Sequence, residues 1–168
     1  MYEERIAVLE RQMEEAAAGD EQIERLQTVP GVGPKVAFAF TAHVAADRFE
    51  DADQVSNYLG LVPRVHMSGE TERYGRITRR GNGYVRALLV QAAWALIRTK
   101  KGGALKERYE YMTKEKGISK KKSIVCIARK LAVLLYTMMR DGSGYETRPL
   151  FKKGKREAEA IALQALSA

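Results

Sequence analysis

The sequence predicts a mainly α-helical fold, made of a helix-hairpin-helix and a small helical bundle, with an irregular arginine-rich loop or β-hairpin inserted. Apolar residues recur at helical spacing over 83–99 and 119–140, which we expect to form the core. A Pro-Gly-Val-Gly corner at 30–33 joins two short helical segments, and β-forming residues with turn signals are concentrated in 61–83. A chain of 168 residues is long enough to bury one such core.

The first expected element is an amphipathic helix over 2–17. Its apolar stripe follows a four-three spacing and comprises Tyr2, Ile6, Leu9, Met13 and Ala16. The stripe lasts little more than two heptads, whereas a sustained coiled coil needs about three or four. The segment is therefore either a helix packed on the core or the remnant of a coiled coil that would serve as a dimerisation arm, and the sequence leaves both open.

Short helices and tight turns follow. Asp20 is expected to cap a helix that ends at Leu26, and Pro34 begins the next helix, which runs to about residue 46. A further helix over 52–59 stops at Gly60, in the position that favours a left-handed cap.

The second half of the chain contains the strongest helical patterns. After the loop or hairpin, a helix over 83–99 is broken by Gly102 and Gly103, and a polar helix then ends at Gly117. Ser119 is expected to cap the longest helix, and the tail over 155–166 has a helical composition. These patterns divide the chain into an N-terminal helix (1–19), a principal domain (20–150) and a helical tail (151–168).

The net charge of +8 is unevenly distributed. Residues 1–60 carry a balance of −7, residues 61–97 carry +4, residues 98–130 carry +9 and the remainder carries +2. Such a division predicts a basic face for a polyanionic partner, although a solvated lysine-rich surface would have the same composition.

The glycine corner has the helix-hairpin-helix pattern over 26–37. Two glycines allow a sharp turn, and the free N–H groups at the start of the following helix can bind a DNA phosphate. The candidate binding residues are Gly31, Val32, Gly33 and Lys35. The alternative is a plain corner between two helices.

A serine surrounded by arginines is the second candidate site. Ser68 is followed by glycine, and guanidinium groups can bind phosphate oxygens and stabilise the charge that develops during phosphoryl transfer. The candidate phosphate-binding arginines are Arg64, Arg73, Arg76, Arg79, Arg80 and Arg86. A serine-glycine pair is also an ordinary turn, and no sequence motif supplies a general base.

Three consecutive lysines at the start of the longest predicted helix form the third candidate. Lys120, Lys121 and Lys122 oppose the helix dipole, which invites a role in phosphate contact, and a solvated face is an equally good interpretation.

Several classes of protein are excluded by the residues available. His43, His66 and Cys126 are too few for a zinc site, and a single cysteine cannot form an intramolecular disulfide. No cofactor motif is present, and no apolar run is long enough to span a membrane. We expect a cytoplasmic protein without a cofactor of its own.

Ordered blocks over about 20–145 closely resemble the C-terminal domain of the insertion-sequence 110/116/902 family of transposases and its related invertases. The blocks that carry the resemblance are Val29-Pro30-Gly31-Val32-Gly33, Tyr58-Leu59-Gly60-Leu61-Val62-Pro63, Ser68-Gly69, Gly75-Arg76-Ile77-Thr78, Arg80-Gly81-Asn82, Ala92-Ala93-Trp94 and Ala128-Arg129-Lys130-Leu131, together with Phe49 and Arg86. The resemblance implies DNA recombination through a covalent phosphoserine at Ser68, guided by a structured RNA.

The resemblance also implies a metal-binding, RuvC-like domain, for which magnesium is the expected ion, ahead of a coiled coil. Nothing in this sequence resembles that domain, so we expect the isolated chain to be an incomplete recombinase. Two other functions remain open: a non-catalytic DNA-binding module that uses only the helix-hairpin-helix, and an oligomerisation domain that uses the N-terminal stripe.

Overall fold

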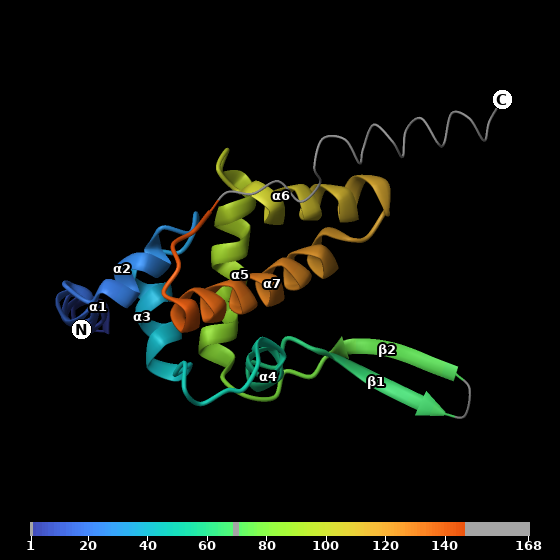
Figure 1. Cartoon of the computed structure of the whole chain (residues 1–168), viewed down its shortest axis with the longest axis horizontal. Coiled ribbons are helices and arrows are strands. Elements are labelled where there is room, and N and C mark those ends of the chain that lie inside the picture. The colour runs from blue at the N-terminus through green and yellow to red at the C-terminus, as the bar shows by residue number, and fades with distance from the viewer. Residues whose placement is uncertain (1, 69–70, 147–168) are drawn as a thin grey trace.

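The computed structural model describes residues 2–68 and 71–146. Within these ranges, residues 65–68 and 71–74 are described by their backbone alone. The prediction of a mainly α fold is confirmed, because helices form all the regular structure of the described residues except one two-stranded antiparallel sheet (Figure 1). The helical tail expected over 155–166 lies outside the described residues. Within the described ranges, every helix is too short or too polar to cross a membrane.

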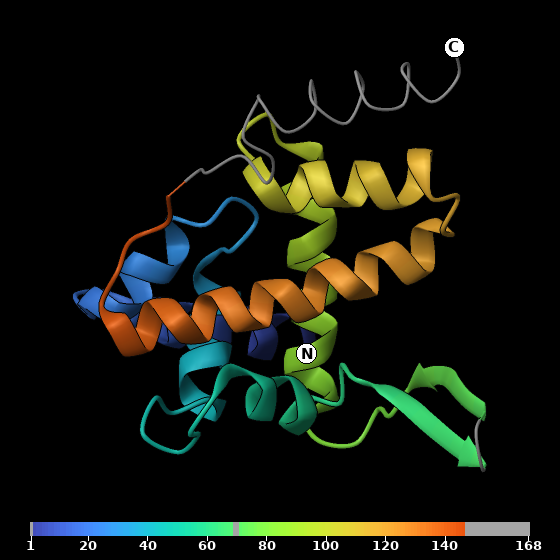
Figure 2. The same cartoon turned by 45° about the vertical axis from the view of Figure 1, so that its right-hand side comes forward.

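The centre of the core is formed by α5 (Gly83–Arg98) and α7 (Lys120–Asp141), as the sequence predicted, and the segment from α2 to α4 contributes further buried residues. The two helices pack directly on each other and cross near the middle of the molecule (Figure 2). Leu89 and Leu96 of α5, and Leu131 and Leu135 of α7, are fully buried. Each such side chain contributes about 1.5–3 kcal/mol relative to an exposed one, so this pair of helices is the support for the surrounding elements.

The glycine corner connects α2 (Glu21–Gln27) to α3 (Pro34–His43). The carboxylate of Asp20 accepts hydrogen bonds from two N–H groups at the start of α2, which confirms the predicted cap. The N–H of Val32 donates to the carbonyl of Val29 at 3.0 Å, and Gly31 takes a φ of +86°. With proline at the second position and glycine at the third, this is a type II turn.

Helix α3 ends at His43, three residues before the predicted end. The cause is a contact distant in sequence. The hydroxyl of the buried Tyr136 on α7 donates to the carbonyls of Ala46 and Phe49, which holds the segment after α3 in an irregular path against the core.

The segment that the sequence left open as a loop or a hairpin is a hairpin. After α4 (Ala52–Tyr58), strands β1 (Pro63–Ser68) and β2 (Thr71–Ile77) pair antiparallel and project from the helical body (Figure 1). The register shifts between Pro63 and Val65, so that two residues of β2 oppose Arg64. This extra residue is a β-bulge.

The polar helix before Gly117 consists of α6 (Gly103–Glu110) and a π-helical turn, η1 (Tyr111–Glu115). Gly117 and Gly142 have left-handed φ values and end their segments. Ser119 occupies the first position before α7, but its side chain makes no capping hydrogen bond, so the predicted side-chain cap was wrong.

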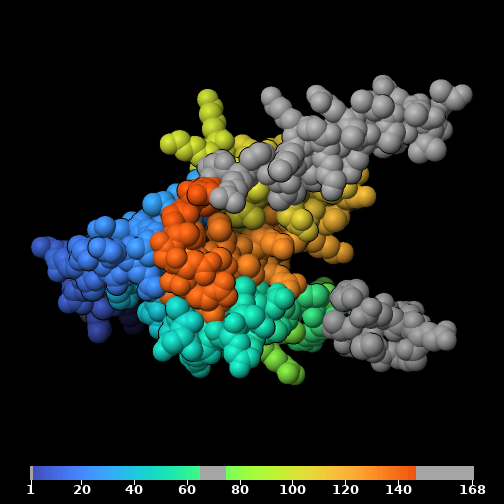
Figure 3. Space-filling model, in the orientation of Figure 1, coloured from blue at the N-terminus to red at the C-terminus, as the bar shows by residue number. Residues whose placement is uncertain are grey.

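The N-terminal helix α1 (Tyr2–Ala17) forms one end of the molecule (Figure 3) and packs on α3. Only its last turns approach the core, through Ala17. Tyr2, Ile6 and Leu9 of the predicted stripe are 81%, 52% and 58% exposed. Packing on the core, one of the two interpretations of this helix, is therefore wrong for the first half of the stripe.

The turn at Gly31 generates the first prediction. A Cβ on Gly31 would lie 2.5 Å from the carbonyl oxygen of Ala92 and 2.7 Å from the nitrogen of Leu96, in addition to requiring a left-handed φ. We expect Gly31→Ala to lower the free energy of unfolding by about 2–4 kcal/mol, measured by urea denaturation.

Gly33→Ala is the matched control. No described atom lies within 4 Å of a Cβ built on Gly33, and its φ is −91°. We expect this variant to change the free energy of unfolding by less than about 1 kcal/mol. Equal stability of both variants would show that Gly31 is not held against α5.

Candidate nucleic-acid interface

Ser68 is the last residue of β1, at the far end of the hairpin from the helical body (Figure 1). Its backbone pairs with Thr71, and His66 pairs with Arg73. Because alternate residues of a strand share a face, positions 66, 68, 71 and 73 lie on the same face of the hairpin. The side chains of Ser68 and Arg73 lie outside the described residues.

Four of the predicted arginines are exposed along the hairpin and its root. Arg64 and Arg76 lie at the bulge, where Arg64 also donates a long hydrogen bond of 3.4 Å to the carbonyl of Thr78. Arg79 and Arg80 lie where the chain leaves β2, and Arg79 has a left-handed φ of +56°. These four arginines therefore lie at the root end of the hairpin, whereas Ser68 lies at its tip, four residues and about 13 Å along β1 from Arg64 at 3.3 Å per residue.

The sixth arginine has a structural role. The guanidinium of Arg86, on the first turns of α5, donates a 2.9 Å hydrogen bond to the carbonyl of Leu59 at the end of α4. This bond joins the two helices from which the hairpin extends. Arg86 is half-buried, and this hydrogen bond anchors the root of the hairpin.

Two glycines fix the root of the hairpin by close backbone contact. A Cβ on Gly60 would lie 2.1 Å from the carbonyl oxygen of Arg80, and one on Gly81 would lie 1.7 Å from that of Tyr58. Both glycines have left-handed φ values, +66° and +91°. The carbonyl of Gly60 accepts a hydrogen bond from the N–H of Arg79 at 3.2 Å. We call residues 58–62 and 78–82 the neck.

The last residue of the neck, Asn82, also caps the start of α5. The side chain of Asn82 accepts hydrogen bonds from the N–H groups of Tyr84 and Val85 at 3.0 and 3.1 Å. The Arg80-Gly81-Asn82 block therefore combines a close backbone contact with a helix cap, which explains its spacing without any ligand.

The glycine corner packs against α5 on one side and faces α1 on the other. The face of Gly31 that would carry a Cβ lies against α5, and Val32 is 4% exposed with its N–H donated to the carbonyl of Val29, so in this part of the turn a phosphate could reach only the remaining, half-exposed side of Gly31. Gly33 faces open space, and among the described residues no group accepts a hydrogen bond from the N–H of Gly33 or Lys35. The part of the corner that can reach a phosphate is thus smaller than the sequence suggested.

Lys35 is already paired with an acid. Its ammonium group donates to a carboxylate oxygen of Glu10 on α1 at 2.6 Å. The hydrogen bond and the charge of Glu10 raise the pKa of Lys35, with a smaller contribution from Tyr84 at the start of α5. The lysine is therefore cationic at neutral pH, and its charge is balanced in this structure.

The lysine cluster is formed by Lys120, Lys121 and Lys122 at the start of α7. All three are exposed, and no ion pair to any of them occurs among the described residues. Lys114 and Lys116 lie on the preceding turn; Lys114 pairs with Glu110 at 3.3 Å, and the ammonium of Lys116 lies 5.7 Å from the ring centroid of Tyr111. We call these five lysines the basic end.

The candidate groups do not all converge. The turn at Gly31 packs on the second half of α5, whereas the hairpin joins its first turn, about 15 Å away along the helix axis at 1.5 Å per residue. The basic end and the hairpin extend toward the same side of the molecule in both cartoon views (Figures 1 and 2).

Two features were not identified from the sequence. Tyr84 is 51% exposed beside the neck, and Lys114 and Lys116 extend the lysine cluster. The first escaped notice because the helical pattern of α5 predicts only its buried face. Within the described ranges, no three histidine, cysteine or carboxylate side chains gather as metal ligands, so no magnesium site is assigned to them.

These features define a mainly α domain with a projecting arginine-bearing hairpin and a basic end. The family model described as "Transposase IS116/IS110/IS902 family" matches residues 23–110, from α2 to the end of α6. The chain belongs to this family.

Curated relatives agree with this assignment. A "Probable family 20 transposase" of Pseudomonas aeruginosa is 44% identical over 97 residues, which cover 57% of this chain and 29% of the relative. The "Transposase for insertion sequence element IS1111A" of Coxiella burnetii is 31% identical over 82% of this chain and 38% of the relative. A "Pilin gene-inverting protein" of Moraxella bovis is 29% identical over 73% and 38%. The chain thus spans 29–38% of the length of these three relatives.

Proposed function

We propose that this chain is the DNA-handling part of a transposase or site-specific recombinase and corresponds to the C-terminal domain of the longer members of its family. In this proposal Ser68 is the nucleophile that forms a covalent phosphoserine with DNA. The observation that supports the proposal is the hairpin, because it carries Ser68 at its tip and four exposed arginines at its root.

The proposed reaction exchanges one phosphate ester for another. The oxygen of Ser68 attacks a DNA phosphorus, a serine–phosphate bond forms, and one bond to a strand oxygen breaks. The serine proton is transferred away, and the departing strand oxygen gains a proton to become a hydroxyl. A strand hydroxyl then attacks the phosphoserine, which restores the serine and joins DNA.

The arginines act on the charge of the phosphate in this reaction. Arg64 and Arg76 lie at the bulge on the shaft of the hairpin, and Arg79 and Arg80 lie at its neck. Guanidinium groups bind phosphate oxygens through paired N–H groups and stabilise negative charge as it develops. Their positions at the root of the hairpin are suited to following a DNA strand, whereas the arginine position nearest Ser68 is Arg73, which pairs with His66.

DNA backbone contacts elsewhere position the duplex. The lysines of the basic end are point charges on flexible stems, which suits phosphate contact without base readout. At the glycine corner, the N–H groups of Gly33 and Lys35 lie at the positive end of the α3 dipole. Binding at both places is expected to tolerate any sequence and to weaken with salt.

Two further partners belong to the proposal. A structured guide RNA, a second polyanion, would be held by the same basic surfaces. A second copy of the chain would cover the exposed stripe at Tyr2, Ile6 and Leu9 of α1, as expected for the end of a coiled coil. The proposal places this activity in the cytoplasm.

The nucleophile is tested by covalent trapping on a nicked suicide DNA substrate, using the longest natural protein that contains this sequence. We expect a protein–DNA adduct that withstands denaturing electrophoresis and is absent from Ser68→Ala. The control is Ser119→Ala, which removes an exposed hydroxyl that caps nothing and should trap as well as the unmodified protein. Equal trapping by Ser68→Ala would remove the nucleophile and leave a DNA-binding module.

Phosphate contact by the basic end is tested by replacing Lys120, Lys121 and Lys122 with glutamine. We expect weaker binding to duplexes of unrelated sequence, and a salt dependence reduced by about one released ion for each lysine that contacts a phosphate. The measurement is fluorescence anisotropy at several salt concentrations.

The control replaces three arginines of the acidic segment 1–60 with glutamine, so that it loses the same three positive charges. These residues are Arg5, Arg11 and Arg48. Its salt dependence is expected to stay close to that of the unmodified protein. Equal losses in the two triple variants would show that net charge alone, rather than the basic end, determines binding.

A further inference from the structure

We propose that α1 acts as an acidic guard of the glycine corner, so that its carboxylates and a DNA phosphate compete for the same place at the start of α3. This inference rests on the proposed binding of phosphate at that corner. It assigns to α1 a role in regulating DNA affinity that is separate from any pairing of its apolar stripe.

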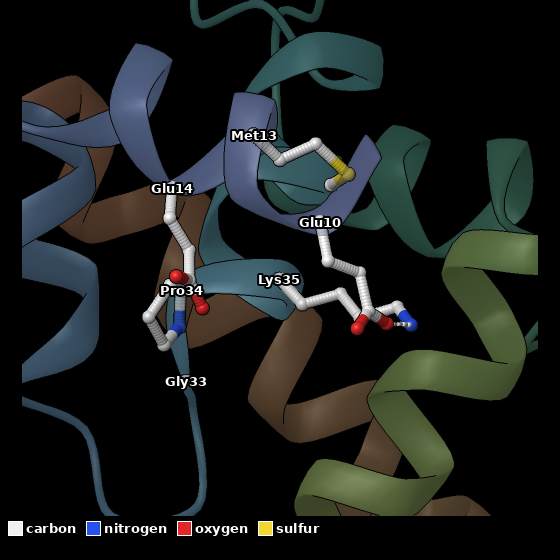
Figure 4. Close-up of a pocket in the computed structure, with 6 residues that line it drawn as sticks. All are labelled: Glu10, Met13, Glu14, Gly33, Pro34 and Lys35. Atoms are coloured by element: carbon white, nitrogen blue, oxygen red, sulfur yellow. Dashed lines mark hydrogen bonds and ion pairs between the residues drawn. The ribbon is translucent and has the colours of Figure 1, made fainter. Parts of the chain in front are cut away.

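The first observation is the position of the acids. Glu10 and Glu14 lie one helical turn apart on α1, and both side chains extend toward the start of α3 (Figure 4). With Met13 they form one wall of an open cavity of about 200 Å³, and the other wall is formed by Gly33, Pro34 and Lys35. The side of the corner that is left open by the bare Gly33 therefore faces two carboxylates.

The second observation is the pairing of Lys35. Its ammonium, the only side-chain cation among the described residues that line the cavity, is held at 2.6 Å by Glu10. Glu10 accepts a hydrogen bond from one of the three N–H donors of this ammonium and balances its charge, so a phosphate that used Lys35 would be repelled by the carboxylate beside it. Glu14 has no described ion pair and adds a second negative charge to the approach.

The contact is of a kind that can be displaced. The two partners are about half exposed, at 48% for Lys35 and 46% for Glu10, so water and salt weaken their attraction. A nucleic acid brings many phosphates and gains entropy by releasing its counterions. The guard is therefore expected to lower affinity without abolishing it, and to release the corner when DNA is concentrated nearby.

The experiment compares two charge-matched variants of the full 168-residue chain, by anisotropy with a duplex of arbitrary sequence. Glu10→Gln/Glu14→Gln removes the carboxylates that face the corner. Glu3→Gln/Glu15→Gln removes two carboxylates of the same helix that do not line the cavity. At low salt we expect the first pair to raise affinity about fivefold, and the second to raise it less than twofold.

Adding Lys35→Gln to the unmodified chain and to both glutamate variants tests whether the gain in DNA affinity arises at the corner. If α1 guards the corner, Lys35→Gln removes most of the gain made by Glu10→Gln/Glu14→Gln and has little effect on the unmodified protein, in which the lysine is already engaged. Circular dichroism and thermal unfolding of every variant check that α1 and α3 remain folded.

Other outcomes separate the guard from the proposed function. Equal gains in the two glutamate pairs overturn the guard, and so does a gain that persists in full after Lys35→Gln. If Lys35→Gln weakens binding by the unmodified chain while the glutamate pairs behave alike, the corner binds DNA without a guard. If Lys35→Gln has no effect in any background, phosphate binding at the corner fails, and the guard fails with it.

Discussion

Close contacts between backbone segments at three glycines fix the positions of the glycine corner and the arginine-bearing hairpin. At Gly31, Gly60 and Gly81 a Cβ atom would come within 2.5 Å of a backbone oxygen of another segment. All three also have left-handed φ values that other residues adopt at a cost. Through them the corner is fixed on α5 and the hairpin is fixed at its neck, so the functional elements depend on packing that leaves no room for a side chain.

The neck connects this packing to the proposed chemistry. A two-stranded hairpin is marginally stable alone, so the position of Ser68 depends on what holds the root of the hairpin. Gly60, Gly81 and the hydrogen bond from Arg86 to Leu59 hold it to α4 and α5. Both of these helices in turn pack on α7. An arginine that the sequence offers as a phosphate ligand thereby also serves to orient the hairpin.

Local sequence signals predicted most of the fold, because helical periodicity, Asp20 and the glycines act over a few residues. These signals were less informative where a contact with a residue distant in sequence determines the local structure. The early end of α3 depends on Tyr136, which lies about ninety residues away. The inward face of Gly31 depends on α5, and the pairing of Lys35 depends on α1. In the candidate site, the arginines of the hairpin could be identified from composition, whereas the anchoring role of Arg86 required coordinates.

Amide hydrogen exchange at the neck tests this account most directly. The N–H of Thr78 donates to the carbonyl of Val62 at 2.9 Å, and that of Arg79 donates to Gly60 at 3.2 Å. If the neck fixes the hairpin to the core, both amides exchange as slowly as the buried amides of α5, through opening of the whole domain. Exchange at the rate of exposed loop amides, while α5 stays protected, would contradict a rigid neck and show that the hairpin moves independently of the helices.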